Sequence, residues 1–233
     1  DLQLKQAMRM GAERRGGPVS ADAEDGRTTP SDGERPTALF EQFSPADVRD
    51  LLAEFPLALV SASGEAPASL LPLIGDFDAA GSLVELVGHM SRRNPLVGAL
   101  RRDARATIQV LGPQGYVSPE DAGRRDWAPT WNYAQLGIEA QVSFTPEETG
   151  LAVRRLVETM EAGRGRPWRV GELGDRYAAM ERRIIGFRAR VTGLRGRFKL
   201  AQDEAPETAR AIVAATRDPA LARWTARFNE GRW

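Results

Sequence analysis

Three short segments carry the side chains whose types and spacing could support binding chemistry. The first reads GHMSRRNP over residues 88–95 and lies where a predicted strand ends and a short predicted helix begins. Backbone N–H groups at such a junction lack partners, and hydroxyl, imidazole and guanidinium groups beside them suit an anion such as phosphate. The alternative is a polar strand end whose histidine merely caps the turn. The candidate residues are His89, Ser91, Arg92, Arg93 and Asn94.

The second segment combines aromatic and amide side chains. Residues 112–119 read GPQGYVSP and residues 128–133 read APTWNY. Gly and Pro at these positions predict rigid turns, and the loop they bracket would present flat aromatic faces and an amide. Such a loop could hold a planar heterocycle, or it could be a lid of aromatic core residues. The candidates are Tyr116, Trp131, Asn132 and Tyr133, with Trp127 in the charged loop between them.

The third segment, GRFKLAQ at residues 196–202, follows a strand predicted to end at Leu194. Lys199 supplies a point charge and Gln202 an amide, so the pair could reach a phosphate or a planar ring. A solvated strand end explains them equally well. Of the 32 basic residues only Lys5 and Lys199 are lysines, which raises the question of what Lys199 does.

Composition excludes several function classes. With no cysteine and one histidine, the chain cannot form disulfides, zinc–sulfur sites or histidine-cluster metal sites, so we expect no metal. No Ser-His-Asp order, carboxylate pair or phosphate-cradling glycine loop supports covalent or hydrolytic chemistry. A net charge of zero argues against a large nucleic-acid surface, although a local basic patch stays open. No apolar window is long enough to span a membrane, so we expect a cytoplasmic protein; a processed leader before Asp1 stays open.

The apolar pattern predicts the elements that must position these segments. A helix begins after Ser44, where Ser-Pro-Ala-Asp offers a cap. The order, β-rich first and then helical, predicts a mainly β α+β protein: a small antiparallel barrel with helices packed outside. Strands are expected at residues 57–62, 68–74, 82–88, 106–111, 133–144 and 184–194, and further helices at 94–102, 147–162, 172–183, 206–215 and 219–228.

The predicted organisation has three parts. Residues 1–36 read as a flexible extension, or alternatively as an arm that wraps a partner subunit. Residues 37–203 form the barrel domain, and residues 204–233 form a C-terminal helical tail packed on it.

Taken in order, GHMSRRNP, GPQGYVSP, PTWNY, PWRV and GRFKLAQ resemble the PaiB family of FMN-binding proteins in the pyridoxamine-phosphate-oxidase-like split-barrel superfamily. The resemblance runs from Phe40 to Gln202. It implies an FMN-binding split barrel with Greek-key-like antiparallel strands, and a homodimer with two FMN molecules at the interface, each touched by both chains. It assigns the FMN phosphate to His89, Ser91, Arg92 and Arg93, with Asn94 beside them, and makes Trp131, Asn132, Lys199 and Gln202 flavin neighbours.

The chain also departs from this family. Residues 120–126 replace its Trp-Tyr pair and lysine-containing loop, and its Trp-Lys-Leu-Ser-Gln becomes Phe198 to Gln202, without the indole donor and the hydroxyl. The histidine that commonly follows PTWNY is absent, with Leu136 and Gly137 in that region. We therefore expect cofactor binding to survive and the substrate or partner to differ.

Two functions are compatible with these features. One is a flavin-dependent oxidoreductase acting on a small molecule, with Tyr116, Trp127 and Tyr133 bounding the substrate pocket. The other is a flavin-binding negative transcriptional regulator without turnover, although no helix-turn-helix is recognisable. Two further alternatives are a haem-binding relative, for which His89 is the sole imidazole, and a barrel that has lost its cofactor. Nothing in the sequence identifies the substrate.

Overall fold

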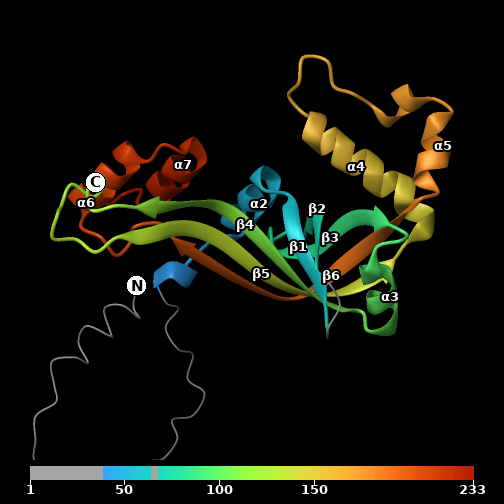
Figure 1. Ribbon diagram of the computed structural model, residues 1–233, viewed down its shortest axis with the longest axis horizontal. Helices are drawn as coiled ribbons and strands as arrows, with labels where there is room; N and C mark the ends of the chain where they lie inside the picture. The colour runs from blue at the N-terminus through green and yellow to red at the C-terminus, as the bar shows by residue number, and fades with distance from the viewer. Residues whose placement is uncertain (1–38, 64–67) are drawn as a thin grey trace, which may run out of the picture. The chain divides into compact units, whose positions relative to one another are not determined.

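A computed structural model describes residues 39–63 and 68–233; the predicted extension at 1–36 and residues 64–67, between the strands predicted at 57–62 and 68–74, lie outside these ranges. Six antiparallel strands close into a barrel in the order β1-β2-β3-β6-β5-β4, with helices outside it (Figure 1). The predicted fold class is confirmed. The strands are β1 (Leu57–Ala62), β2 (Ser69–Phe77), β3 (Leu83–Ser91), β4 (Arg105–Val117), β5 (Thr130–Phe144) and β6 (Ile184–Lys199).

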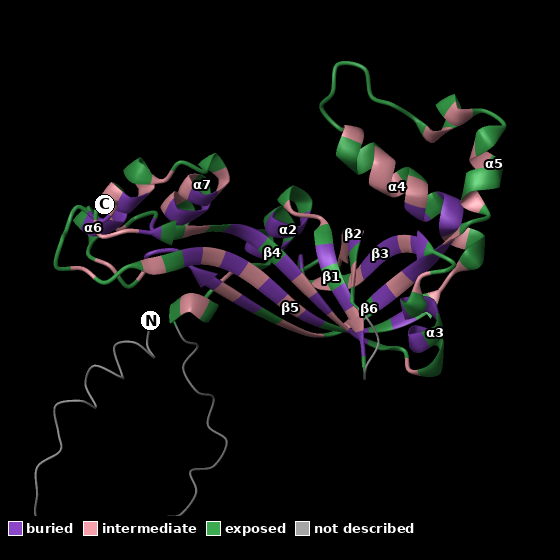
Figure 2. Ribbon diagram, in the orientation of Figure 1, coloured by how far each residue is buried: buried purple, intermediate pink, exposed green. Residues whose placement is uncertain are grey.

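The barrel consists of two three-stranded meanders. The first is β1–β2–β3 and the second is β4–β5–β6; helix α3 (Pro95–Arg102) connects them, and the pairs β1–β4 and β3–β6 close the barrel. Along most strands the buried side chains alternate with more exposed ones (Figure 2), as expected when one face of a sheet forms the core. Large residues that fill the interior include Leu73, Leu86, Ile108, Ile138 and Phe187.

Five strands, β2 to β6, are longer than the sequence pattern predicted, and the extensions of β4, β5 and β6 lie together. Residues 112–117, expected to form a turn and loop, continue β4. A β-bulge between Leu111 and Gln114 accommodates Pro113, which lacks an N–H group. Trp131 and Asn132 belong to β5, and β6 runs past Leu194 to Lys199. These extensions form a three-stranded ribbon (residues 112–117, 130–135 and 195–199) beyond the part of β4 that pairs with β1.

Two C-terminal helices cover one face of this ribbon. They are α6 (Pro206–Ala215) and α7 (Pro219–Arg227), and α7 contacts β4 and β5. The ring of Phe198 stacks on Phe228 with centroids 4.8 Å apart and on Trp224 at 6.0 Å. Gly115 allows the close approach, since a Cβ there would lie 2.7 Å from Leu221 Cδ2.

Helix α4 (Thr149–Glu161) covers part of the opposite end of the barrel, next to β3 and β6. The N–H of Gly186 donates to Thr149 Oγ1 at 2.9 Å, and a Cβ on Gly186 would stand 3.0 Å from the Thr149 backbone. The helix predicted at 172–183 is only α5 (Arg176–Glu181), because Gly174 adopts φ +52° after a 3₁₀ turn at Val170–Leu173. Two shorter 3₁₀ turns are Leu39–Glu41 and Pro146–Glu148, and α2 is Pro45–Glu54.

The cap predicted at Ser44 is confirmed. Its side chain accepts from the Asp47 N–H, and the Asp47 carboxylate accepts from the Ser44 N–H in return. Within the described residues, no helix combines the length and apolarity that a membrane crossing needs. Nor do three or more His, Asp or Glu side chains of this part of the chain gather where they could hold a metal ion.

Candidate functional site

The first predicted group, which we call the strand-end cluster, lies where β3 ends and α3 begins. It consists of His89, Ser91, Arg92, Arg93 and Asn94. The Ser91 hydroxyl accepts from the Arg93 N–H at 3.2 Å, and the Asn94 side chain caps α3 by accepting from the Leu96 N–H at 3.0 Å. Asn94 therefore has a structural role at the helix start. The Arg92 and Arg93 side chains are exposed, and among the described residues neither forms an ion pair.

His89 is the half-buried member of this cluster. It pairs with Gly186 across β3 and β6, close to the start of α4. Its Nδ1 atom is buried and has no hydrogen-bond partner within the described part of the chain. Burial lowers the pKa of His89 below its ordinary value of 6.5, so the imidazole is neutral at pH 7. A buried ring nitrogen without a partner can serve as a donor to a ligand.

The aromatic candidates gather on the ribbon face that α7 leaves open. Tyr116 and Trp131 are paired in the β4–β5 register, and their rings meet edge to face with centroids 6.1 Å apart. Both are exposed, at 55% and 53%. Tyr133 is half-buried, and its hydroxyl accepts from Arg197 Nε at 3.0 Å. Two large aromatic side chains exposed side by side are unusual for a monomer surface and mark a place for a ligand or partner.

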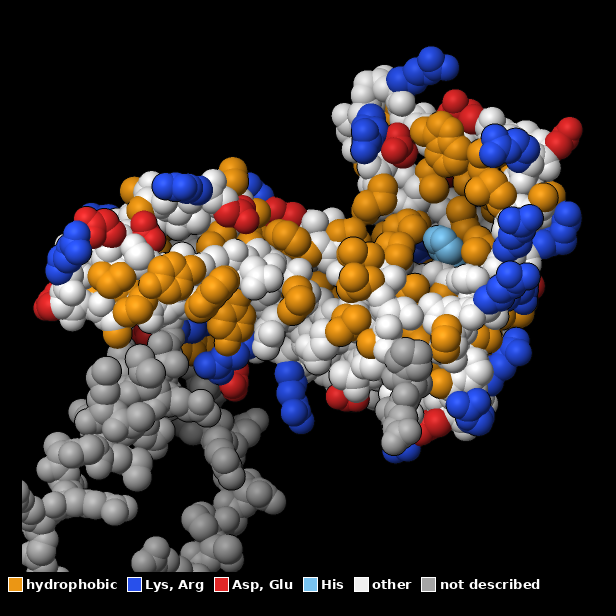
Figure 3. Space-filling view, in the orientation of Figure 1, with side chains coloured by type: hydrophobic (Ala, Val, Ile, Leu, Met, Phe, Trp, Pro, Cys, Tyr) orange, Lys and Arg blue, Asp and Glu red, His pale blue; other side chains and the backbone are white. Residues whose placement is uncertain are grey.

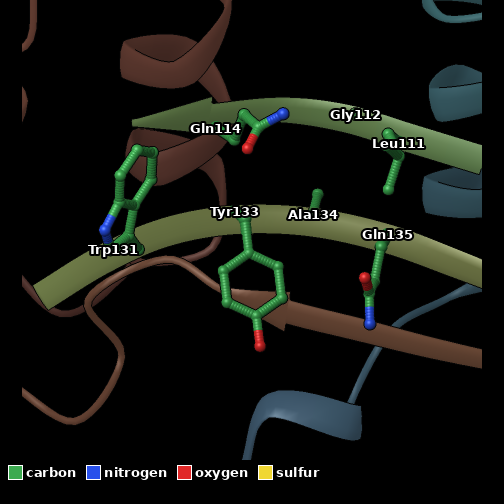
Figure 4. A pocket seen from close by; sticks show the side chains of 7 residues that line it. All are labelled: Leu111, Gly112, Gln114, Trp131, Tyr133, Ala134 and Gln135. Atoms are coloured by element: carbon green, nitrogen blue, oxygen red, sulfur yellow. The ribbon is translucent and has the colours of Figure 1, made fainter. Parts of the chain in front are cut away.

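A pocket of about 310 Å³ lies on this ribbon. Figure 4 shows Trp131 and Gln114 at one end of it and Leu111 and Gln135 at the other, with Tyr133 between. Its volume is at the lower end of the range for small-molecule sites. Aromatic faces and two carboxamides, each with donors and acceptors, suit a planar heterocycle with ring nitrogens and carbonyls.

Lys199, the last residue of β6, pairs with Tyr133 in the sheet register. It is 8% exposed, and its Nζ donates to Thr130 Oγ1. Lys199 is thus a buried basic side chain at the end of the ribbon, opposite the pocket residue Tyr133 in the sheet register.

Gln202 and Trp127 have contacts that account for them without a ligand, whereas Asn132 does not. Asn132 is 2% exposed, lies on the face opposite Trp131, and its Nδ2 has no partner among the described residues. Gln202 braces the turn after β6, where its side chain accepts from the Leu200 N–H and donates to the Phe198 carbonyl, both at 2.6 Å. Trp127 donates to Glu204 Oε2 at 2.9 Å and packs against a small cluster beneath α6.

The strand-end cluster and the ribbon face are far apart in one chain. Gly186, the partner of His89, and Lys199 both belong to β6 and are separated by 13 residues (199 − 186). At roughly 3.3 Å per residue this is about 40 Å along the strand. A single mononucleotide cannot reach both groups of one protomer.

The sequence analysis missed an exposed apolar face on the neighbouring side of the barrel. Leu59 on β1 pairs with Leu70 on β2, and Leu57 and Leu111 lie beside them. Their exposed fractions run from 38% to 62%. Figure 3 shows hydrophobic side chains gathered over this part of the barrel. Leu111 also lines the pocket, so the apolar face is continuous with the ribbon site. The sequence signal for this face is the run of consecutive apolar residues in β1 and in β2. The pattern of the strands alone does not show that the leucines pointing out of the barrel stay exposed.

Comparison with known proteins gives the family. Residues 36–193 match the family described as "Putative FMN-binding domain", which is more than half of the chain. The chain belongs to this family. No curated protein matches the sequence.

Two solved structures show the extent of the structural similarity. The FAD- and heme-binding protein from Mycobacterium smegmatis aligns with a TM-score of 0.49 at 18% identity, over 67% of this chain and 71% of that one. The flavocytochrome from Azotobacter vinelandii aligns with a TM-score of 0.47 at 14% identity, over 70% of this chain and 71% of that one.

The residues present fit a flavin nucleotide at two points. At the strand-end cluster, exposed guanidinium groups and the partnerless buried Nδ1 of His89 match the needs of a phosphate. On the ribbon, the aromatic faces and carboxamides of the pocket match a planar ring with polar edges. Because the strand-end cluster and the ribbon pocket of one chain are far apart along β6, a single flavin nucleotide cannot contact both within one protomer.

Proposed function

We propose that this member of the FMN-binding family is PaiB-like and binds FMN as a homodimer, at two equivalent sites between the protomers. In each site the strand-end cluster of one protomer holds the phosphate, and the ribbon face of the other protomer holds the ring. The observation that carries the proposal is the separation of about 40 Å between these groups along β6. In this proposal a second copy of the chain supplies the missing half of each site.

The exposed apolar face supports the proposal that a second copy of the chain packs against it. Leu57, Leu59, Leu70 and Leu111 form a contiguous group on the outside of the barrel, and water-exposed leucines at this density favour association. Because Leu111 lines the pocket as well, a protomer that covers the leucines also approaches the ribbon. Most closed homo-oligomers are twofold dimers in which each surface patch is used twice, which gives two identical sites.

We propose an oxidoreductase acting on a small molecule. Bound FMN supplies hydride or single-electron transfer. The chain's own residues bind and orient: Arg92 and Arg93 neutralise the phosphate, while Trp131 and Tyr116 offer aromatic surface beside the ring. Gln114 and Gln135 can donate to or accept from ring heteroatoms.

The alternative function, a flavin-binding regulator without turnover, is favoured by one observation. Among the described residues, those that line the ribbon pocket include no carboxylate, histidine or lysine. Their one titratable group is the Tyr133 phenol, which already accepts from Arg197. Sensing by a bound flavin needs no general acid or base, so a pocket without one is compatible with a regulator.

An absorbance spectrum between about 300 and 700 nm, recorded before and after adding FMN and again after desalting, tests the proposal. We expect a flavin spectrum that survives desalting and is lost in Arg92→Ala but retained in Arg102→Ala, an exposed arginine of α3. Failure to retain FMN in the wild type would overturn it. Bleaching by a nicotinamide nucleotide would favour the oxidoreductase, and salt-sensitive retention on DNA without bleaching would favour the regulator.

A further inference from the structure

Four arginines lie together where β3 ends and β6 begins. The Arg92 N–H donates to the Arg183 carbonyl at 2.9 Å, and Arg92 Nε donates to the Arg182 carbonyl at 3.1 Å. The turn that carries Arg92 and Arg93 is thus fixed against the turn that carries Arg182 and Arg183. We call these residues the four-arginine group. Sequence analysis singled out only the first two, because ninety residues separate the two turns in the chain.

The four-arginine group has no acidic partners. All four residues are exposed, and among residues 39–63 and 68–233 none of them lies within ion-pair distance of a carboxylate. The preceding Glu181 faces α4 instead, where its Oε1 would lie 2.5 Å from a Cβ built on Gly150. Some other arginines of the described chain pair with carboxylates (Arg105, Arg124, Arg125, Arg155, Arg164, Arg188, Arg197, Arg223 and Arg227), whereas others, such as Arg101, Arg102 and Arg166, do not. The feature that sets the four-arginine group apart is the contact between its two turns.

This charge exceeds what one phosphate monoester balances. Guanidinium groups stay protonated, so the group carries four positive charges at any physiological pH. A phosphate monoester carries about −1.5 to −2 at pH 7, which leaves roughly half of the charge uncompensated. His89 is not counted among these charges, since burial lowers the pKa of its imidazole in the ligand-free protein. Figure 3 shows Lys and Arg side chains gathered along this side of the barrel.

We propose that the four-arginine group binds a diphosphate, the linkage of a dinucleotide, with Arg182 and Arg183 holding the second phosphoryl group. Arginine guanidinium groups bind phosphoryl oxygens in pairs, and the two turns, fixed against each other, bring four arginines to one end of the barrel. The diphosphate can belong to a flavin dinucleotide, or to a nicotinamide dinucleotide that arrives as reductant. This inference relies on the proposed function only where it assigns the first phosphoryl group to Arg92 and Arg93.

Calorimetric titration of the flavin-free chain with inorganic pyrophosphate and with inorganic phosphate, at one ionic strength, tests this site. We expect pyrophosphate to bind about tenfold or more tightly than phosphate. In Arg182→Gln/Arg183→Gln we expect this preference to disappear while phosphate affinity changes little. The matched control is Arg166→Gln/Arg169→Gln, two exposed arginines of the segment after α4, which should retain the preference. Equal affinities in the wild type, or an unchanged preference in Arg182→Gln/Arg183→Gln, would overturn the proposal.

Displacement of bound pyrophosphate identifies its source. If FAD displaces it and binds more tightly than FMN, the diphosphate is that of the flavin. If NADPH displaces it from the FMN-loaded protein, the diphosphate is that of the reductant. If neither dinucleotide displaces it, the dinucleotide assignment is wrong. Pyrophosphate binding is measured without flavin, so its failure and a failure to bind FMN are separate results.

Discussion

His89 and Lys199 mark opposite ends of β6: His89, on the neighbouring strand β3, pairs with Gly186 near the start of β6, and Lys199 is the last residue of β6. Each end carries half of the features that a flavin nucleotide needs. The strand-end cluster offers charge and no aromatic surface, while the ribbon offers aromatic surface and carboxamides. This division within one chain is the reason for proposing a site shared by two protomers.

Two tryptophans of the second segment should respond differently to substitution. Trp131→Ala should abolish FMN retention and change stability by less than about 0.5 kcal/mol, because the side chain is exposed. Trp127→Phe should leave FMN retention intact and cost about 1–3 kcal/mol, because it removes the donor to the Glu204 carboxylate. Flavin absorbance after desalting measures FMN retention, and urea unfolding measures stability. Loss of FMN in Trp127→Phe together with retention in Trp131→Ala would instead place Trp127 at the ligand.

The leucine pair on β1 and β2 should control assembly. Leu59→Glu/Leu70→Glu places two carboxylates on the exposed apolar face and should convert the proposed dimer to a monomer that also loses FMN. Leu151→Glu, on an exposed leucine of α4, is the matched control and should remain dimeric. Light scattering during gel filtration gives the masses, and a Leu59→Glu/Leu70→Glu protein that stays dimeric would place the interface elsewhere.

The single imidazole provides a direct pH probe. Burial lowers the folded-state pKa of His89 below 6.5, so its contribution to stability is complete above pH 6.5 and is lost as the pH falls through the lower folded-state value. Proton NMR titration of the one histidine should show this depressed pKa. Adding FMN should raise it, because a nearby phosphate favours the charged imidazole. An unchanged pKa in the FMN-loaded protein would remove His89 from the phosphate site.

Helix α4 should loosen from the barrel in acid. Arg188 donates to Glu148 at 2.6 Å and to Glu85 at 2.5 Å, and Arg155 donates to Asp76 at 3.1 Å, which ties α4 and the turn before it to β2, β3 and β6. The Arg188 hydrogen bond lowers the pKa of Glu148 below its ordinary 4.5. This stabilisation is therefore present above pH 4.5 and lost as the pH falls through the lower folded-state pKa. Between pH 6 and about pH 3, the midpoint temperature of thermal unfolding should fall less steeply for Glu148→Gln than for the wild type. Parallel curves of midpoint temperature against pH would contradict this.

Local sequence signals predicted most of the elements. The cap at Ser44, strand β1 and helix α6 lie where the pattern placed them, because each depends on neighbouring residues: a capping box, a turn and a proline at the first helical position. The segment at 112–117 was assigned to a loop, since Gly and Pro usually end a strand. Pairing with β5, thirteen or more residues away, and a bulge at Pro113 override that preference.

The candidate site was predictable in its residue types and only partly in its geometry. Spacing identified Arg92 and Arg93 as anion-binding candidates, but Arg182 and Arg183 become their neighbours only through the β3–β6 pairing. Gln202 has the chemistry of a ligand-binding amide, yet the turn at Ala201, with φ +67°, uses both ends of its side chain. Non-local pairing of this kind leaves no periodic trace in a single sequence.

Mixed dimers test the shared site most directly. One differently tagged chain carries Arg92→Ala/Arg93→Ala and the other carries Tyr116→Ala/Trp131→Ala, and the mixed dimer is purified through both tags. We predict that neither homodimer retains FMN and that the mixed dimer retains one FMN per dimer, half of the wild-type content, because one of its two sites has both halves intact. A mixed dimer that retains no FMN would contradict the account, since it would mean that each site is built within a single chain.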